Sequence, residues 1–432
     1  MRTVKKIKQL ALWGLFGLLL SWLVSCQSTP SNPTASGEKG GIQFWTMQLQ
    51  PQFTPYFTEL IGNFKTTNPD ITVKWEDVPW DAMQSKILTS ISAKTAPDVV
   101  NLNPNFASQL AGKNAWLDLS SKVSPDIQKQ YLPKIWQANT LNNLSFGIPW
   151  YLTTRVTIYN QDLLKKAGIT TPPATYEELA KVAKTIKDKT GKYAFFITFS
   201  PGDSGEVLES MVQMGVKLVD EQGKAAFDTP EGLAAFKYWV DLYQQGLLPP
   251  EVLTQGHRHG VELYQSGSTA LLSSGAEFLK TIEKNAPTIA KASAAAPQIT
   301  GKTGKKNVAV MNLVIPRDSK QADEALKFAL FVTNADNQLA FTQQGGTLPS
   351  NIEAIERYIA KLDKESSGSS VEQARKVSAS QLKDAEVLIP PMKDFNQLQK
   401  LIYENLQAAM LKQKTVEQAV KESAEAWNAL QS

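Results

Sequence analysis

The chain has 432 residues, too many for one ordinary hydrophobic core, so we expect two or three domains. Its 42% hydrophobic and 20% charged content exclude a disordered chain and a multispan membrane protein. The net charge is +4, but residues 1–25 hold four basic side chains and no acidic one, so the other 41 of the 45 basic groups match the 41 acidic groups. A neutral body lacks the basic surface that binds nucleic acid, and no nucleic-acid partner is expected.

The N-terminus has the organisation of a secretory signal peptide. A basic stretch at residues 1–9 precedes an apolar run at 10–20, which is too short to span a bilayer. The only cysteine, Cys26, ends the tetrapeptide Leu-Val-Ser-Cys, which resembles the bacterial lipobox. We therefore predict that residues 1–25 are a signal peptide and that the sulfur of Cys26 carries a lipid. An acylated Cys26 leaves no thiol for disulfides, metals or catalysis.

The segment after Cys26 is predicted to be a flexible tether. Residues 27–40 contain no bulky apolar side chain, so they cannot bury enough surface to offset the entropy of ordering. Fully extended, such a segment reaches roughly 50 Å. The signal peptide, lipidated Cys26 and tether (26–40) together predict a protein held near a membrane in the cell envelope, on the periplasmic or extracytoplasmic side.

The first part of the body alternates strands and helices. Residues 41–47 are predicted to form a strand, and the apolar spacing from Phe53 to Phe64 places one stripe on a helix. A second strand with alternating apolar residues at 71–75, a second helix and a third strand at 97–102 follow. This order is typical of a parallel sheet with helical crossovers.

The pattern resumes after residue 149. We expect strands at 155–159, 193–199 and 269–273, a helix capped by Thr175 with Glu178, and a helix that starts at Thr229-Pro230. The last eighty or so residues are expected to be wholly helical.

Several apparent catalytic or metal motifs are rejected. Gly202-Asp203-Ser204-Gly205 looks like a serine-protease motif, but the only two histidines, His257 and His259, follow the serine. This histidine pair has no adjoining carboxylate on its loop, so it is interpreted as exposed rather than metal-binding. No metal, cofactor or catalytic residue is predicted. Paired carboxylates of a secreted glycoside-acting enzyme remain the alternative, because no local motif excludes them.

Three turns after predicted strands share a chemistry. They contain Met47-Gln48, Pro79-Trp80-Asp81 and Asn103-Pro104-Asn105, and each follows the carboxyl end of a strand. Ligands bind at that edge of an open parallel sheet. Aromatic faces, amides and carboxylates suit sugars, since rings stack on C–H faces while polar groups satisfy hydroxyls.

The chain also resembles the extracellular solute-binding lipoproteins of carbohydrate ABC importers, the family that includes maltose-binding protein. The resemblance covers essentially the whole mature chain. Its marks are a series of short motifs in order: Ala96-Pro97-Asp98-Val99-Val100, Gly147-Ile148-Pro149-Trp150-Tyr151, Ile158-Tyr159-Asn160-Gln161-Asp162-Leu163-Leu164, Gly267-Ser268-Thr269-Ala270-Leu271, Ile315-Pro316-Arg317 and Gly345-Gly346-Thr347-Leu348-Pro349-Ser350.

The resemblance implies an α/β fold of the periplasmic-binding-protein type. Two α/β lobes are joined by a hinge of chain crossovers near 153–155, 306–312 and 349–352, with the ligand in the cleft between them. Lobe one comprises 41–153 plus 307–349, and lobe two 154–306 plus 350–432. Ligand that contacts both lobes favours the closed form, which the permease of the importer can recognise. A monomer is expected from the family.

Ligand-binding positions follow from the resemblance, position by position. They are Met47, Gln48, Trp80, Asn103, Asn105, Trp150, Tyr151, Thr153, Ser200, Asp203, Ala276, Glu277, Phe278, Phe395 and Asn396. Glu277 stands where the family commonly has tryptophan, and Phe395-Asn396 replaces a Phe-Trp pair, which argues against maltose itself. The implied ligand is a mono- or oligosaccharide or a glycosylated polyol. A glycerol phosphodiester stays open, with Arg155 as its nearest cation.

Overall fold

The computed structural model describes residues 41–364, 368–389, 392 and 394–431. The predicted signal peptide, Cys26 and the tether lie outside the described residues. Within the described part of the chain, no helix is long and apolar enough to cross a membrane.

The first three strands form the predicted parallel sheet with helical crossovers. Strand β1 (Ile42–Met47) lies between β2 (Val73–Val78) and β3 (Val99–Leu102), parallel to both. The connecting helices are α1 (Thr54–Thr67), α2 (Trp80–Ser92) and, after β3, α3 (Pro104–Ala111). Helix α1 buries Tyr56, Phe57, Leu60 and Phe64 on one face, as the apolar spacing predicts.

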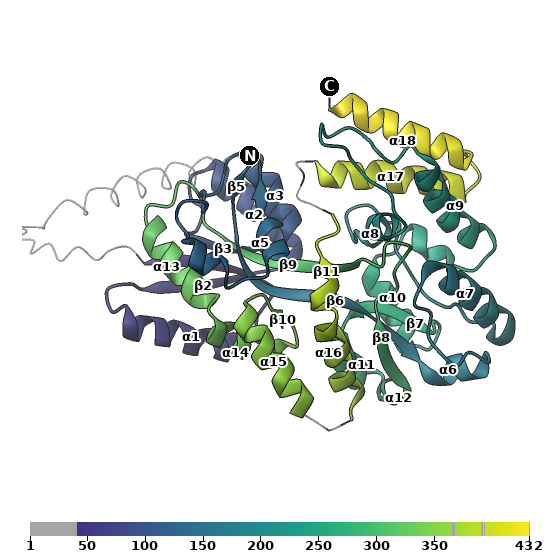
Figure 1. Cartoon of the computed structure of the whole chain (residues 1–432), viewed down its shortest axis with the longest axis horizontal. Coiled ribbons are helices and arrows are strands. Elements are labelled where there is room, and N and C mark those ends of the chain that lie inside the picture. The colour runs from purple at the N-terminus through teal and green to yellow at the C-terminus, as the bar shows by residue number, and fades with distance from the viewer. Residues whose placement is uncertain (1–40, 365–367, 390–391, 393, 432) are drawn as a thin grey trace, which may run out of the picture. The chain divides into compact units, whose positions relative to one another are not determined.

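Two long antiparallel strands extend this sheet. Strand β9 (Lys306–Val314) pairs with β3 on one side and with β6 (Ile148–Asn160) on the other. The first half of β6 pairs with β9, and its second half pairs with β7 (Leu271–Gly275) and β8 (Ser293–Pro297). Strand β6 therefore runs continuously from the first part of the fold into the second (Figure 1).

Short elements surround these strands. Two short strands complete the sheet, β10 (Leu348–Pro349) on β6 and β11 (Ala385–Glu386) on β9, while β4 (Thr140–Leu141) and β5 (Leu144–Ser145) form a separate hairpin. The shorter helices are α4 (Pro125–Gln128), α5 (Pro133–Gln137), α6 (Gln161–Lys166), α11 (Phe278–Asn285), α12 (Pro287–Lys291), and the 3₁₀ turns η1 (Pro250–Leu253) and η2 (Leu382–Asp384).

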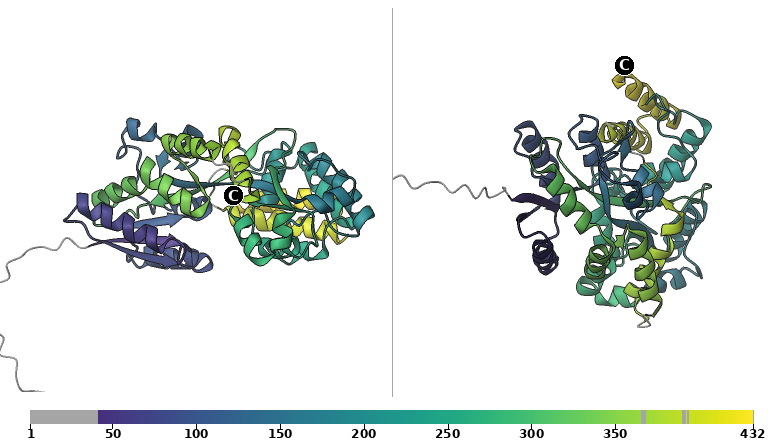
Figure 2. Two further views of the ribbon diagram at one scale, coloured as in Figure 1. Left: turned by 90° about the horizontal axis from the view of Figure 1, so that it is seen from below. Right: turned by 60° about the vertical axis from the view of Figure 1, so that its left-hand side comes forward.

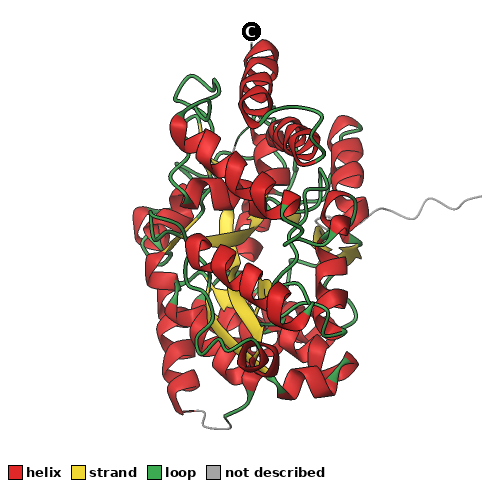
Figure 3. Cartoon of the chain, turned by 90° about the vertical axis from the view of Figure 1, so that its right-hand side faces the viewer, coloured by secondary structure: helices red, strands yellow, loops and turns green. Residues whose placement is uncertain are grey.

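Longer helices pack around the sheet, as Figure 3 shows. They are α7 (Tyr176–Thr190), α8 (Glu206–Gln213), α9 (Pro230–Gln244), α10 (His257–Gln265), α13 (Ala322–Val332), α14 (Ala335–Gly345), α15 (Ile352–Lys364), α16 (Ser370–Ser380), α17 (Phe395–Met410) and α18 (Val416–Leu430). Helices α17 and α18, yellow in Figure 2, pack together and against α9. Thr175 and Thr229 cap α7 and α9 as predicted.

Three predictions about local structure are wrong. Residues 193–199 are buried but not a strand, since only Tyr193 bridges to Thr269 before the backbone turns to single contacts such as Phe199 N–H to Val252 O, 2.8 Å. The strand expected at 269–273 starts two residues later, as β7. The C-terminal part is not wholly helical, because β11 interrupts it to extend β9.

The buried apolar side chains form two main cores. One, here called the first core, draws its buried residues from 42–151 and 311–341. The other, the second core, draws them from 164–271 and 395–427. Smaller clusters around the middle of β6 and β9 include Leu152, Val156, Val308 and Val310. The crossing strands thus connect two separately packed bodies.

Candidate functional site

The turn after β1 is held by a carboxylate from the neighbouring strand. Asp77 accepts hydrogen bonds from the Thr46 hydroxyl (2.6 Å), the Leu49 N–H (2.9 Å) and the Gln50 N–H (2.9 Å). Between these donors, Gln48 adopts a left-handed φ of 53°, which non-glycine residues rarely populate. Asp77 is not among the predicted site residues, because its place beside the β1 turn follows from the pairing of β1 with β2.

The same turn meets the start of α2. The side-chain carbonyl of Gln48 accepts a hydrogen bond from the backbone N–H of Trp80 at 3.2 Å. The Trp80 side chain is 45% exposed, the largest aromatic group among the exposed hydrophobic residues of the described chain. The structure thus brings Gln48 and Trp80 together at the carboxyl edge and leaves an indole face available for stacking.

The third turn is ordered mainly by helix capping. The Asn103 side chain accepts the N–H of Phe106 at 2.9 Å and begins α3. Asn105 lies in the first turn of that helix, and its side chain is outside the described part. Half of the Asn103 hydrogen-bonding capacity, its side-chain NH₂, is not used by this cap.

Five of the predicted site residues are buried in the apolar clusters: Met47, Trp150, Tyr151, Ala276 and Phe395. Met47 and Trp150 belong to the first core, where Trp150 packs against Phe44 and Phe341. Ala276 and Phe395 are also buried; the Phe395 ring packs close to Gly205. These buried side chains pack the interior and offer little surface to a ligand.

Tyr151 lies where the two bodies meet on β6. Its ring lies edge-to-face on Trp150 and tilted against Phe341, and burial raises the pKa of its hydroxyl, helped by the charges of Asp77 and Glu277. Asp77 comes from the first parallel sheet and Glu277 from the turn after β7. Tyr151 therefore joins residues from both predicted lobes at one place, beside the half-buried Thr153.

An ion cluster lies next to this tyrosine on β6. The Arg155 guanidinium is within 3.6 Å of a Glu206 oxygen and 3.4 Å of a Glu209 oxygen, and it donates to the Ser204 hydroxyl at 3.2 Å. Burial would lower the pKa of Arg155, but the two carboxylates raise it overall. Burial raises the pKa of Glu209 despite the opposing effect of Arg155. The sequence analysis missed both glutamates because α8 carries them as an ordinary acidic first turn.

Glu277 is the half-buried acid nearest to this cluster. Its carboxylate folds back over Gly275, which pairs in register with Arg155, and no cation of the described chain lies within 4 Å of it. Burial raises the pKa of Glu277, opposed by its own backbone N–H and by Arg155. A carboxylate in this setting is a strong acceptor for hydroxyl donors.

Of the remaining predicted residues, Asp203 and Phe278 contact the first residue of α10. Asp203 accepts the His257 N–H at 2.9 Å, and the His257 ring lies edge-to-face on Phe278 at 5.9 Å. The Ser200 N–H donates to Thr198 Oγ1 (3.0 Å), while Asn396 is exposed at the start of α17.

The interpretation of the two histidines as exposed loop residues is wrong. Both lie in the first turn of α10 and are half-buried, because Asp203 caps that helix and draws it inward. Among the described residues, no group of three or more histidine, cysteine, aspartate or glutamate side chains could hold a metal ion.

The fold and the carboxyl-edge residues define a two-bodied α/β solute-binding protein with crossing strands. A family model described as a bacterial extracellular solute-binding protein matches residues 50–339, and the chain belongs to this family. The resemblance to the binding proteins of carbohydrate ABC importers and the predicted fold class are confirmed.

Individual relatives agree with this assignment. A crystal structure from Synechococcus sp. MITs9220, titled a "putative oligosaccharide periplasmic-binding protein", is 44% identical, covers 90% of this chain and 98% of its own, and gives a TM-score of 0.86. Maltose-bound MalE3 of T. maritima shares the fold at 22% identity, with a TM-score of 0.73 over 90% and 99% of the two chains. A "putative binding protein" of Brucella abortus is 26% identical over 76% of this chain and 81% of its own.

Proposed function

We propose that the chain is a lipid-anchored receptor that captures a neutral sugar or glycosylated polyol and delivers it to the permease of an ABC importer, without turning it over. Lobe one comprises 41–153 plus 307–349, and lobe two comprises 154–306 plus 350–432. The residue ranges of the two cores support this division. Cys26 carries the anchor, the protein works outside the cytoplasm, and it acts as a monomer.

The observation that carries the proposal is the position of Tyr151. The carboxylates of Asp77 and Glu277, one from each body, both raise the pKa of the Tyr151 hydroxyl after burial has done so, and Tyr151 belongs to the strand that joins the two bodies. Trp80 adds an exposed indole on the lobe-one side. A ligand with many hydroxyls and apolar C–H faces can donate to these acids and stack on the indole, contacting both lobes at once.

The ion cluster argues against a glycerol phosphodiester. Arg155, the cation available for a phosphate, is already occupied by Glu206, Glu209 and Ser204. A phosphate there would displace these partners and meet the additional charge of Glu277. Two like charges held close together in a partly buried site repel each other, at a cost on the order of several kcal/mol. A neutral ligand avoids that cost. The 44% identical Synechococcus relative, titled as oligosaccharide-binding, supports the same ligand class.

Thermal unfolding across a ligand panel tests the proposal. The mature chain is heated with mono-, di- and trisaccharides, glycosylated glycerols and glycerol phosphodiesters. A true ligand at 100 times its dissociation constant stabilises the fold by about 2.7 kcal/mol. A shift with one sugar and not its epimers supports the proposal. A shift with phosphodiesters alone contradicts the neutral-ligand assignment, and hydrolysis of a glycoside contradicts the receptor role.

A matched pair of variants places the ligand. Trp80→Ala should lower the affinity for the identified sugar by about tenfold while leaving the unfolding midpoint of the free protein unchanged, because the indole is exposed. Leu411→Ala removes a similarly exposed apolar side chain, 49% accessible, from the α17–α18 turn and should change neither. Cys26→Ala should release the chain from the membrane fraction.

A further inference from the structure

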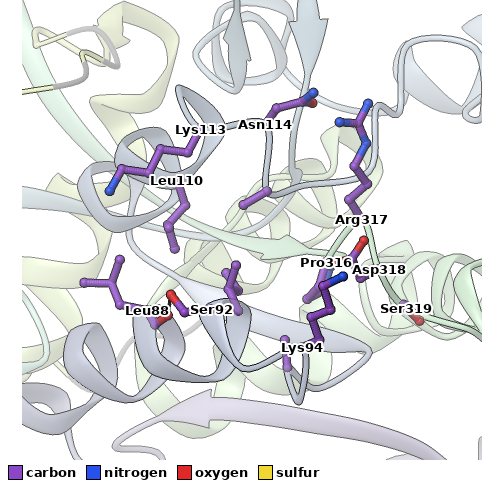
Figure 4. Close-up of a pocket in the computed structure, with 13 residues that line it drawn as sticks. Leu88, Ser92, Lys94, Leu110, Lys113, Asn114, Pro316, Arg317, Asp318 and Ser319 are labelled. Atoms are coloured by element: carbon purple, nitrogen blue, oxygen red, sulfur yellow. Dashed lines mark hydrogen bonds between the residues drawn. The ribbon is translucent and has the colours of Figure 1, made fainter.

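A second pocket lies in the first core's body, away from the cleft. Its volume is ≈ 240 Å³, and Leu88, Ile91, Leu110 and Pro316 supply an apolar floor. The charged lining residues are Lys94, Lys113, Arg317 and Asp318. Figure 4 shows Lys113 on one side of this pocket and Lys94 and Arg317 on the other. A cationic rim over an apolar floor suits an anionic group attached to an apolar body.

The topology places this pocket at the sheet edge opposite the sugar site. Its walls are the carboxyl-terminal ends of α2 and α3 and the turn after β9. Helices α2 and α3 follow β2 and β3 and return toward the amino ends of the parallel strands. Strand β9 is antiparallel to β3, so its carboxyl end lies at the same edge, and all three walls meet there. A six-residue strand separates the two edges by about 20 Å.

The rim cations have no internal ion pair. Within the described chain, no carboxylate oxygen lies within 4 Å of a charged nitrogen of Lys94, Lys113 or Arg317, whereas many surface lysines, such as Lys181 with Glu177, are paired. The three cations and Asp318 give a formal charge of +2. The carboxyl ends of α2 and α3 subtract about half a charge each, leaving about +1. The pocket remains attractive to an anion.

The pocket wall is tied to the point where the tether begins. The Gln321 side chain donates to the Gly41 carbonyl at 3.3 Å. The Ser319 hydroxyl donates to Asp98 at 2.6 Å, and Asp98 accepts the Gln43 N–H at 2.9 Å. Gly41, where the described part of the chain begins, is therefore bonded to the segment that follows the pocket wall. An anchor at Cys26 keeps this edge within roughly 50 Å of the bilayer, the reach of a fully extended tether.

We propose that this pocket binds the phosphate-bearing head group of an anionic membrane lipid. The phosphate is held by Lys94, Lys113 and Arg317, and the glycerol and first methylenes lie on the apolar floor. The inference rests on the proposed lipid anchor. Docking through this edge keeps the carboxyl edge, with Gln48 and Trp80, turned away from the lipid and open to solute. Cations near an anionic surface each contribute about fivefold in binding, so three give roughly 100-fold.

A fluorescent reporter on the lipidated mature chain tests the proposal. Because Cys26 is the only cysteine, Ser92→Cys at the pocket rim accepts a single polarity-sensitive dye once Cys26 is acylated. The labelled protein is reconstituted in vesicles of pure phosphatidylcholine or with 30% phosphatidylglycerol. Gln413→Cys, exposed between α17 and α18, is the matched control position. A sugar-induced thermal shift confirms that each variant is folded.

We expect the fluorescence of the dye at position 92 to shift to the blue only in the phosphatidylglycerol vesicles. The shift should be lost in the variant Lys94→Gln/Lys113→Gln/Arg317→Gln, and the dye at position 413 should show none. The same spectrum at position 92 in both vesicles overturns the inference while the anchor stands. A chain that does not sediment with vesicles at all overturns the anchor and with it this inference. If inorganic phosphate without vesicles produces the same shift, the site serves a free anion and the lipid assignment is wrong.

Discussion

Removal of the Arg155 charge is the sharpest test of the ion cluster beside the cleft. Arg155→Met keeps the length and the apolar stem of the side chain but leaves Glu206 and Glu209, whose side chains are 13% and 14% exposed, without their cation. Breaking a buried pair in this way destabilises a protein by about 3–5 kcal/mol. Because Arg155 itself is 22% exposed, we expect about 3 kcal/mol at pH 8.

The loss of stability in Arg155→Met should become smaller as the pH falls. Burial raises the pKa of Glu209, and Arg155 opposes that rise, so without Arg155 this acid is easier to protonate in the folded state than in the unfolded state and the folded variant binds more protons. Its stability relative to the parent therefore rises as the pH falls from 8 to 5. Urea unfolding of both proteins across this range measures the difference. The control is Lys237→Met, which breaks an exposed ion pair with Asp241 and should lose less than about 0.5 kcal/mol.

A companion variant separates charge from packing. Arg155→Met/Glu206→Gln/Glu209→Gln carries no charge at these three positions and should recover most of the lost stability. A deficit below 1 kcal/mol for Arg155→Met, or one that does not change with pH, would refute the reasoning that this arginine neutralises two desolvated acids.

Three further variants probe the site and the hinge. Asp77→Ala deletes the acceptor of three hydrogen bonds and should cost about 2–3 kcal/mol in urea unfolding. It should also weaken sugar binding by calorimetry, and unchanged affinity would count against its positioning role. Glu277→Gln removes an acid whose pKa burial raises. Ionisation of such an acid destabilises the fold as the pH rises above its unfolded-state pKa of about 4.5. The variant should therefore be more stable than the parent at pH 8 and equally stable at pH 4. A stability difference that does not change with pH would contradict this. Gln338→Leu removes the buried amide that accepts the Ser350 N–H (2.6 Å) and donates to the Ser350 hydroxyl. We expect it to lower the free energy of unfolding in urea by about 2–3 kcal/mol. An unchanged free energy of unfolding would refute a structural role for Gln338 at the chain crossover near Ser350.

The parallel sheet of the first body was predictable because its sequence signals are local. The stripe from Phe53 to Phe64 and the alternation at 71–75 each follow from one periodicity, and the resulting β1, β2 and β3 are parallel as expected. The strand predicted at residues 193–199 is absent because a strand also needs a partner, which local sequence does not reveal. A buried apolar run has the same composition whether or not a partner strand lies beside it, and here only Tyr193 finds one.

The predicted site residues also differ in how far the local sequence determines their positions. Turn residues such as Gln48 and Trp80 were predictable because the carboxyl edge of a parallel sheet collects them. Met47, which precedes Gln48, is buried in the first core. Trp150 and its neighbour Tyr151 are both buried there too, at a register shift of β6 between Pro149 and Tyr151 that local sequence does not reveal. Asp77 escaped notice because its role depends on the register between β1 and β2, which sequence spacing does not specify.

The crossing strand β6 gives the proposed closure a physical basis. Tyr151 and Arg155 lie four residues apart on it, and each contacts groups that belong to a separately packed body. A rotation of one body against the other changes the distance between the Asp77 and Glu277 carboxylates, because Asp77 lies near the end of β2 and Glu277 follows β7. Without ligand, bringing these two acids together is opposed by charge repulsion. For the proposed receptor we expect a ligand whose hydroxyls donate to both acids to remove that opposition and so to favour closure.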